Sequence, residues 1–405
     1  MPGLIEITDA RRLVADRVDA LEAEPVELRR ALWRVLAEDV TSPEDVPGFD
    51  SSAMDGYAVR AADTAGASAE HPVRLRVVGE SRAGHPAARA PARGEAIAIS
   101  TGAVVPADAD AVVRVEDTDG GRDAVEVQAE VEPGRDIRRA ADDIRAGETV
   151  LSAGTEIGAA EAGVIASIGR AQVRCSRRPR VALLTTGDEL REPGEALDPG
   201  AIRNSNAYSV AGLVEGAGAE LLDPAIVPDD RDATREAIER ALTADVAVLC
   251  GGVSVGAHDH VRPALEALGV EQVFWGVALR PGKPTYFGVA PSGALAFALP
   301  GNPVSAMVTF RLFVRPAIRG LLGADDAAVP RTTAILDEAY EKRPGRAHLV
   351  RCTLRLADDG WHARPTKEQG SHVLTSMLGA DALAVLPTAS GSMAVGDRVE
   401  VELLR

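Results

Sequence analysis

The sequence predicts a multidomain α/β protein that combines a mostly parallel sheet with further β-rich parts. Residues 179–322 alternate continuous apolar runs with helical patterns, which is typical of a parallel sheet covered on both faces. Residues 72–150 and 329–405 carry short β-like runs separated by Gly, Pro and Asp turns. The chain has 405 residues, and a soft prior of roughly 150 residues per domain predicts about two to four domains.

The N-terminal region is expected to be helical. Residues 8–22 place apolar side chains at helical spacing, and residues 26–38 form a second amphipathic pattern. Pro43 and Pro47 then interrupt the helical pattern, so residues 43–60 are expected to form a loop with special backbone positions.

A small β domain is predicted next. A helical stretch at about 158–168 follows it and is expected to pack with the N-terminal helices. The β domain would then be inserted into a helical or mixed domain. Its β-like runs are residues 73–78, 95–100, 110–116 and 123–131.

The alternating region predicts four pairs of a strand and a helix. Because parallel strands need crossover connections, each helix should cover one face of the sheet. The pairs are strand 180–186 with helix 205–218, 219–227 with 232–242, 245–250 with 260–269, and 294–300 with 303–318.

Composition excludes several functional classes. The net charge of −17 argues against nucleic acid as the main partner, since phosphate binding needs a basic face. The apolar runs are too short to span a bilayer, and the polar N-terminus does not resemble a signal peptide. Cys175, Cys250 and Cys352 are far apart and odd in number, which fits a reducing compartment. A cytoplasmic protein without a membrane partner is therefore expected.

Three polar loops each follow an apolar strand of the predicted sheet. The carboxyl ends of parallel strands meet at one edge, which is where open α/β folds bind ligands. Glycines allow backbone N–H groups to approach a ligand closely. One such loop alone could be a tight turn, but three converging loops predict a site for an anionic ligand. The loops are Thr185–Glu189, Gly251–Gly256 and Pro300–Ser305.

Charged side chains are expected at the same edge. Carboxylates beside phosphate-type loops suggest Mg²⁺, or another divalent cation, bridging a phosphate or oxyanion. Helix capping is the alternative for Asp229 and Asp230. Arg280 and Lys283 are candidates to hold anionic oxygens, with a surface turn as the alternative. The acids are Asp188, Glu189, Asp229, Asp230 and Asp259.

Several motifs stand in order over most of the chain. They are Phe49–Ala58 (FDSSAMDGYA), Ser100–Ala103, Ala109–Val113, Thr186–Leu190, Asn204–Asn206, Gly251–Gly256 with Asp259, Arg280–Pro284, Leu299–Ser305 and Gln369–His372. Together they resemble the family of MoeA and the gephyrin E domain.

The resemblance implies four domains and an elongated homodimer. The site would lie between the α/β domain of one protomer and the β domain of the other. A helical or mixed N-terminal domain would be split into residues 1–44 and 144–177, around an inserted β-rich domain at 45–143. Residues 178–328 would form a molybdopterin-binding α/β domain, and 329–405 a C-terminal β barrel.

The resemblance also assigns site residues, with Arg351 as a further candidate. Arg280 stands where a Lys is common in the family, so a planar fork replaces a point charge. Catalytic roles fall on Asp55, Thr101, Asp143, Glu189 and Asp259, and metal binding on Glu189, Asp230 and Asp259. Substrate contacts fall on Gly251, Gly252, Ser254, Gly256, Arg280, Lys283, Pro300, Gly301, Asn302, Ser305 and Ser371.

The implied activity is insertion of molybdenum from molybdate into adenylylated molybdopterin, with release of AMP. An adenylyltransferase that makes this substrate could deliver it. A gephyrin-like scaffold without catalysis, a tungsten-specific paralogue and the adenylyltransferase itself are the alternatives. The retained acids argue against a scaffold, and the MDGYA segment and C-terminal part argue against the adenylyltransferase.

Overall fold

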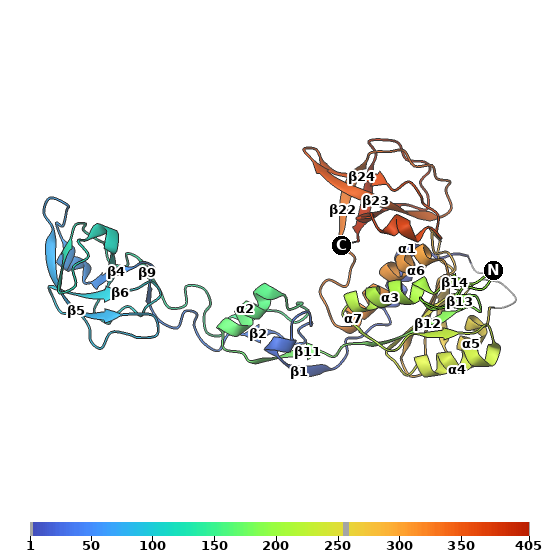
Figure 1. Cartoon of the computed structure of the whole chain (residues 1–405), viewed down its shortest axis with the longest axis horizontal. Helices are drawn as coiled ribbons and strands as arrows, with labels where there is room; N and C mark the ends of the chain where they lie inside the picture. The colour runs from blue at the N-terminus through green and yellow to red at the C-terminus, as the bar shows by residue number, and fades with distance from the viewer. Residues whose placement is uncertain (1–2, 254–258, 405) are drawn as a thin grey trace. The chain divides into compact units, whose positions relative to one another are not determined.

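The computed structural model describes residues 3–253 and 259–404, which divide into two compact units. The larger unit comprises Met1–Glu38, Ala153–Gly158 and Gln172–Arg405, and the smaller unit comprises Asp39–Ser152 and Ala159–Ala171. Figure 1 gives the element labels used below. Across the described ranges, no helix combines the length and the apolar character needed to cross a membrane.

A seven-stranded sheet forms the centre of the larger unit, in the order β15-β12-β17-β21-β20-β18 with β16 also paired to β12. All pairings among β15, β16, β12, β17 and β21 are parallel, whereas β20 and β18 are antiparallel. The prediction of a mostly parallel sheet is therefore confirmed. The strands are β12 (Arg180–Thr186), β15 (Glu220–Leu221), β16 (Ala225–Val227), β17 (Val246–Cys250), β18 (Glu271–Trp275), β20 (Tyr286–Val289) and β21 (Leu295–Leu299).

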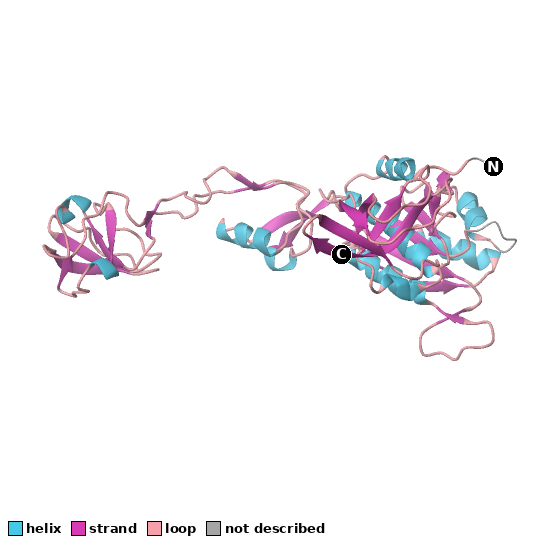
Figure 2. Cartoon of the chain, turned by 90° about the horizontal axis from the view of Figure 1, so that it is seen from above, coloured by secondary structure: helices cyan, strands magenta, loops and turns pink. Residues whose placement is uncertain are grey.

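Helices cover both faces of this sheet, because successive residues of a strand point to opposite faces. Val181 and Leu183 pack in one core with α1, α3, α6 and α7, while Ala182 and Leu184 pack in a second core with α4 and α5. Figure 2 shows these helices on both sides of the strands. Their bounds are α1 (Ile7–Ala15), α3 (Ser205–Gly216), α4 (Arg231–Ala241), α5 (Val261–Ala267), α6 (Pro303–Thr309) and α7 (Arg315–Leu321).

The predicted helix at 303–318 exists, but it is not uniform. A π-helical segment, η4 (Phe310–Val314), separates α6 from α7. Pro316 has no backbone N–H, so the carbonyl of Leu312 has no donor four residues later. The Nε of Arg11, on α1, donates to that carbonyl over 3.4 Å.

The predicted helix at 26–38 is wrong. Ala23–Glu27 forms strand β1, which pairs antiparallel with β11 (Gln172–Ser176), and Leu28–Arg30 is a single 3₁₀ turn. The apolar residues that suggested a helix lie instead in or beside a strand whose partner comes 145 or more residues later in the chain. Trp33 also has a φ of 63°, which no right-handed helix contains. The first helix is also shorter than predicted, since α1 ends at Ala15.

A closed ring of five strands forms the C-terminal barrel. The ring runs β23-β24-β22-β26-β25 and closes by the pairing of β25 with β23. A short strand, β19 (Leu279–Arg280), joins β23 from outside the ring. The strands are β22 (Arg331–Leu336), β23 (Ala347–Ala357), β24 (Gly360–Pro365), β25 (Ala382–Leu386) and β26 (Arg398–Leu403).

The smaller unit is built on a five-stranded sheet in the order β7-β4-β6-β5-β8. Its second strand, β4, lies between β7 and β6 and belongs to the segment expected to be a loop. A Cβ added to Gly56 would lie 1.9 Å from the carbonyl oxygen of Val113, so only glycine allows β4 and β7 to approach. The elements are β2 (Val40–Thr41), β3 (Ser51–Ser52), β4 (Gly56–Val59), β5 (Val73–Ser81), β6 (Glu95–Ile99), β7 (Ala111–Arg114), β8 (Ala124–Val127), β9 (Ile137–Arg138), β10 (Thr149–Leu151) and α2 (Ala159–Ser167).

Candidate active site

A cavity of about 600 Å³ opens at the carboxyl ends of β12, β17 and β21 in the larger unit. The three polar loops expected at this edge all contribute to its wall, so their predicted convergence is confirmed. The ribbon of β13 (Leu190–Arg191) and β14 (Ile202–Arg203) forms a further side of the wall. Lining residues from the three loops include Thr186, Gly187, Glu189, Gly251, Gly252, Val253, Pro300, Gly301, Asn302 and Pro303.

The loop after β12 depends on Gly187. Its φ is 146°, and a Cβ there would lie 2.5 Å from the carboxylate of Glu189. The glycine thus leaves room for Glu189 to fold over the loop, where it remains exposed in the cavity wall. Asp188 accepts a hydrogen bond from the backbone N–H of Asp229 over 3.0 Å, which ties this loop to the turn after β16.

The loop after β17 needs two glycines. Gly251 and Gly252 have φ values of 100° and 64°, in the region that favours glycine. A Cβ on Gly251 would lie 2.7 Å from Oγ1 of Thr186, and one on Gly252 would lie 2.6 Å from Cγ2 of Val261. The loop therefore presents backbone rather than side chains to the cavity. Two residues predicted to bind substrate, Ser254 and Gly256, lie outside the described residues.

The loop after β21 is held by two asparagines. Nδ2 of Asn206 donates to the carbonyl of Gly301 over 2.7 Å, and Nδ2 of Asn302 donates to Oγ of Ser371 over 3.0 Å. Asn302 precedes α6 as expected, but its side chain reaches the C-terminal barrel instead of capping the helix. Ser305 is buried one turn into α6 and does not line the cavity.

Asp259 is a half-buried acid in the wall of the cavity. Neither of its carboxylate oxygens has a hydrogen-bond partner among the described residues, although both are shielded from solvent. Burial raises the pKa of Asp259 to about 6. The backbone N–H groups of Val261 and Arg262, which do not meet hydrogen-bond geometry, and the Arg262 guanidinium lower it only in part. A buried carboxylate without a donor is a natural ligand for a hard cation.

The other acids divide between the cavity and a helix start. Asp229 lines the cavity. Oδ1 of Asp230 accepts hydrogen bonds from the backbone N–H groups of Asp232 and Ala233, over 3.0 Å and 2.9 Å, and so caps α4. Within residues 3–253 and 259–404, no three His, Cys, Asp or Glu side chains form a ready-made metal cluster.

Several basic residues lie near the point where β19 pairs with β23 of the barrel. Arg280 ends β19 opposite His348, and Lys283 follows in the next turn; both are exposed. Arg351 is only 1% exposed and donates through Nη2 to the carbonyls of Glu368 and Gly370, over 3.0 Å and 3.3 Å. Its Nε has no partner among the residues described. The buried guanidinium of Arg351 therefore holds the backbone of the segment that carries Ser371.

The remaining predicted residues belong to the smaller unit. Oδ1 of Asp55 accepts a hydrogen bond from the backbone N–H of Thr101 over 2.7 Å, so these two predicted residues are in contact. Asp143 is exposed, and its backbone N–H donates to the carbonyl of Val46. Asp55 and Thr101 form one cluster, to which no described hydrogen bond connects Asp143.

Three family models match this chain in succession. The MoeA N-terminal region (domain I and II) matches residues 5–169, a "Probable molybdopterin binding domain" matches residues 182–320, and the MoeA C-terminal region (domain IV) matches residues 333–404. A Mycobacterium tuberculosis protein named molybdopterin molybdenumtransferase 2 is 37% identical, over 98% of both chains. The chain belongs to the MoeA family.

Further MoeA relatives agree over the full length. The molybdopterin molybdenumtransferase of Haemophilus influenzae is 35% identical over 94% of each chain. A crystal structure titled as the molybdopterin biosynthesis MoeA protein of Pyrococcus horikoshii shares 31% identity and a TM-score of 0.84, covering 99% of this chain and 100% of that chain. The multidomain α/β fold with a C-terminal barrel is thus the MoeA fold.

Several residues of the MoeA cavity were not singled out from the sequence for a site role. Thr186 has a buried Oγ1 without a partner among the described residues, and Asn204 donates to both Thr185 and Glu192. Ile202 and Arg203 line the wall from β14. The Asn204–Asn206 motif was the available signal for Asn204 and the Thr186–Leu190 motif for Thr186, whereas nothing in the local pattern marks Ile202.

Proposed function

We propose that this MoeA-family chain is a molybdopterin molybdenumtransferase, which inserts molybdenum from molybdate into adenylylated molybdopterin and releases AMP. The observation that carries the proposal is the position of Asp259, a buried carboxylate without a partner among the described residues, in a cavity walled by glycine-rich backbone. Such backbone suits phosphate oxygens, and the carboxylate suits a cation that accompanies them. The names of the full-length relatives support the same activity.

Mg²⁺, or another divalent cation, fits this donor set. Glu189 and Asp259 line the cavity, and Asp230 is kept as a third ligand because its cap to α4 uses only Oδ1. When bound, the cation would supply Lewis-acid stabilisation of the phosphoanhydride. The protein's own part is to hold the phosphates along the Gly251–Gly256 and Pro300–Ser305 loops and to exclude bulk water.

Molybdate is proposed to bind beside the dithiolene through Arg280 and Lys283. Ser371 and the buried Arg351 would complete this oxyanion region, since Asn302 links Ser371 to the loop after β21. Water attacks the phosphoanhydride and AMP leaves. The two dithiolene thiols of the pterin then bind molybdenum in place of one oxide of molybdate, which takes up the two thiol protons and leaves as water. Positioning and charge neutralisation account for the rate, without a covalent enzyme intermediate.

We also propose the domain organisation, the oligomeric state and the location of the protein. The four domains have the bounds predicted from the sequence, and the family-model matches support a division near residues 169–182 and 320–333. The active form is a homodimer in which Asp55, Thr101 and Asp143 serve the partner's cavity. An adenylyltransferase delivers the substrate in the cytoplasm, where the buried, unpaired Cys175, Cys250 and Cys352 would remain reduced.

The test is to incubate the chain with adenylylated molybdopterin, molybdate and Mg²⁺ and to measure AMP. Release of AMP with molybdenum bound to the pterin is expected. Binding without AMP release would favour a scaffold, and formation of ATP from adenylylated molybdopterin when pyrophosphate is added would favour the adenylyltransferase. Tungstate replaces molybdate in a parallel reaction, to test the alternative of a tungsten-specific paralogue.

Two neighbouring acids provide matched variants. Asp229→Asn changes a cavity side chain, whereas Asp230→Asn changes a helix cap. If Asp230 holds the cation, Asp230→Asn raises the Mg²⁺ concentration needed for half-maximal activity. Unchanged Mg²⁺ dependence in Asp230→Asn, with a shift in Asp229→Asn, would transfer the ligand role to Asp229.

A further inference from the structure

Trp33 occupies a backbone position that suits glycine. Its φ is 63°, where a bulky side chain is a conformational outlier, and the position is fixed by the Trp33 N–H donating to the carbonyl of Ile157 over 2.9 Å. The side chain is 64% exposed, so burial does not compensate for this conformation. A large aromatic ring held in solvent at a strained position points to a use for the ring itself.

The ring borders a cavity of about 610 Å³ in the larger unit. The cavity is separate from the one at the carboxyl ends of the strands, because it lies at the opposite end of α3, beside Glu215 and Gly216. Its remaining wall includes Arg178, Glu156 and Glu220. The site described above uses none of these residues.

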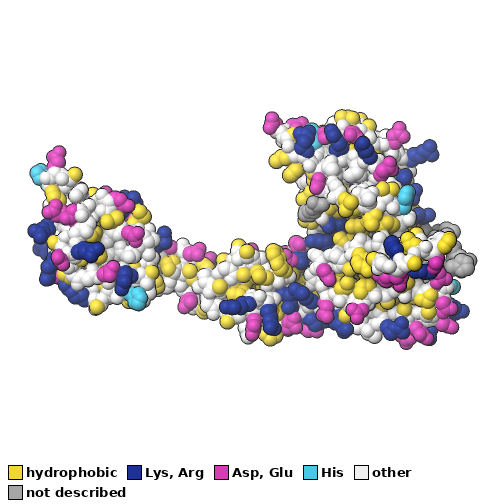
Figure 3. All heavy atoms as spheres, in the orientation of Figure 1, with side chains coloured by type: hydrophobic (Ala, Val, Ile, Leu, Met, Phe, Trp, Pro, Cys, Tyr) yellow, Lys and Arg dark blue, Asp and Glu magenta, His cyan; other side chains and the backbone are white. Residues whose placement is uncertain are grey.

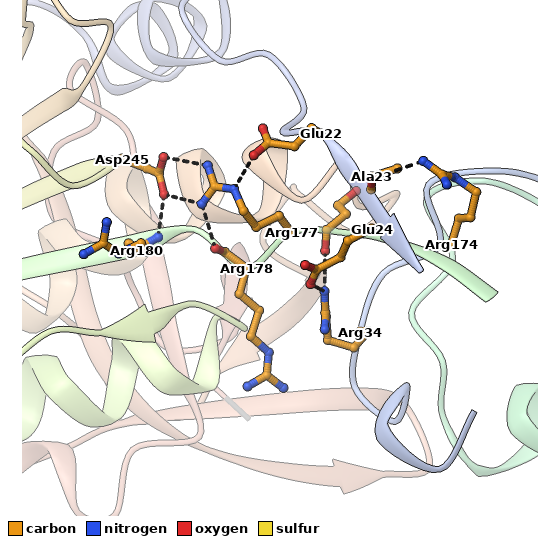
Figure 4. Close-up of polar contacts among 10 residues, drawn as sticks. Glu22, Ala23, Glu24, Arg34, Arg174, Arg177, Arg178, Arg180 and Asp245 are labelled. Carbon is orange, nitrogen blue, oxygen red and sulfur yellow. Dashed lines mark hydrogen bonds and ion pairs between the residues drawn. The ribbon is translucent and has the colours of Figure 1, made fainter. Parts of the chain in front are cut away.

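Some charged side chains in and around this wall already have hydrogen-bond or ion-pair partners, and others have none among the described residues. Figure 4 shows that neighbouring arginines are paired, with Arg177 bound to Asp245 and Glu22, and Arg34 bound to Glu24. The guanidinium of Arg178 has no such partner among the described residues. Within the cavity, Glu156 is engaged by Arg319 over 2.6 Å.

Two carboxylates of the wall remain unused. The side chains of Glu215 and Glu220 form no hydrogen bond or ion pair with any residue that the structure describes. Both lie beside the C-terminal end of α3, a helix of 12 residues whose last carbonyls carry partial negative charge. The indole face of Trp33 is a third feature that attracts cations. The cavity therefore favours a positive group, with Arg178 as its one unpaired cation among the described residues.

We propose that this cavity docks an arginine or lysine side chain of a partner protein. The cationic group stacks on the indole of Trp33 and pairs with Glu215 or Glu220. The guanidinium of Arg178 donates to a carbonyl or carboxylate of the same partner segment. A protein is favoured over a small cation because exposed tryptophans next to pockets are typical anchors of protein interfaces. The chain's net charge of −17 would also attract a basic partner.

The first test uses Trp33 as its own reporter. Trp275→Phe and Trp361→Phe leave Trp33 as the sole tryptophan of the full chain. The probe is the blocked peptide Gly-Arg-Gly-Arg-Gly, and its citrulline counterpart is the neutral control. A saturable change in Trp33 emission is expected with the arginine peptide, with affinity about 5- to 30-fold weaker for the citrulline peptide. Equal responses, or no saturable response up to about 10 mM peptide, would overturn the proposal.

The second test separates the ring from the backbone. Glu215→Gln with Glu220→Gln should weaken arginine-peptide binding by about 10-fold while leaving the fold intact. Trp33→Gly should abolish binding in calorimetry and raise the thermal midpoint, because glycine removes the conformational cost. A lower midpoint would make Trp33 a packing residue and defeat the proposal. Loss of a dimer in sedimentation with Trp33→Gly would do the same, by identifying a second copy as the occupant.

Discussion

Asp259 combines a proposed functional role with a cost to the folded state. Its carboxylate is buried without a hydrogen-bond partner among the described residues, and its pKa is raised to about 6 from an ordinary value near 3.8. Because the folded pKa lies above the unfolded one, the folded state holds its proton more tightly. The carboxyl group's contribution to stability is thus fully present below about pH 4 and is lost as the pH rises through about 6.

We expect Asp259→Asn to lose AMP release by at least about 100-fold. In the absence of divalent cations, the same variant should be more stable than the wild type at pH 7.5, by roughly 1–3 kcal/mol, and no more stable at pH 4.5. Thermal unfolding in EDTA at the two pH values measures this. A wild-type chain that loses no more stability than the variant between these pH values would contradict the assignment.

Gly252 tests whether the loop after β17 depends on glycine. Gly252→Ala places a Cβ 2.6 Å from Val261, at a φ of 64°. We expect a loss of stability of about 2–4 kcal/mol, together with weaker binding of adenylylated molybdopterin. Gly293→Ala is the matched control, since its φ is 88° but its Cβ would meet open space. If the two variants lose equal stability by chemical denaturation, the close approach to Val261 is unimportant.

At the scale of single residues, the sequence predicted the backbone of the loops better than the roles of the side chains. Glycine after a strand allows a positive φ, and Gly187, Gly251 and Gly252 adopt it. The sequence could not separate Asp229 from Asp230, because which carboxylate faces the cavity depends on the residue at which α4 begins. The link from Asn302 to Ser371 joins residues 69 positions apart, so no local pattern contains it.

Among the elements, helix α1 links the barrel to the α/β core through Arg11. Arg11 pairs with the buried Glu402 of β26 at 2.7 Å, and its Nε donates to the Leu312 carbonyl released by Pro316. Glu402 also contacts Arg331 at 2.9 Å. Burial nevertheless raises the pKa of Glu402 to about 7, and the positive charges of Arg331 and Arg311 oppose this rise only in part.

Arg11→Ala should therefore destabilise the larger unit by about 2–4 kcal/mol, because it leaves Glu402 short of one partner and the Leu312 carbonyl without a donor. The matched control is Arg12→Ala. Arg12 is exposed, and its partners among the described residues are Asp9 and Asp16, so its loss should cost about 0–1 kcal/mol. Urea unfolding of both variants provides the comparison. Similar losses would show that the junction does not depend on Arg11.

Elements were predicted well where their partners are close in sequence. The strands and helices of residues 180–318 follow one another, and their patterns predicted the parallel strands and their helices, apart from the broken strand at 219–227 and the π segment. The antiparallel strands β18 and β20 were not predicted. β1 and β4 were missed because their partners are distant. β1 pairs with residues 172–176, and β4 pairs with β6 and β7, both of which come later in the chain.

For the whole chain, the parallel sheet followed from apolar periodicity, but the closed barrel did not. The strands of residues 331–403 have ordinary alternating patterns, and only the pairing of β25 with β23 closes the ring. The barrel was expected from the family resemblance alone. The assignment of Asp55 and Thr101 to a site also came from that resemblance, since both lie in the smaller unit while the described cavity belongs to the larger one.

The proposed homodimer makes a prediction that distinguishes shared from separate sites. Asp55→Asn and Asp259→Asn should each be inactive alone, because each removes one side of a site built from two protomers. Co-expression of the two variants, with random pairing, yields mixed dimers in about half of cases. Each mixed dimer then has one site with both substitutions and one site with neither. The mixture should recover about one quarter of wild-type AMP release.

The mixed dimers can be isolated by placing different affinity tags on the two variants. After two-step purification they should show about half of the wild-type activity per dimer, with an unchanged KM for the intact site. Sites built within a single protomer would leave every site with one substitution, so both preparations would stay inactive. That result would remove the cross-subunit role of Asp55 while leaving the assignment of Asp259 to the cavity intact.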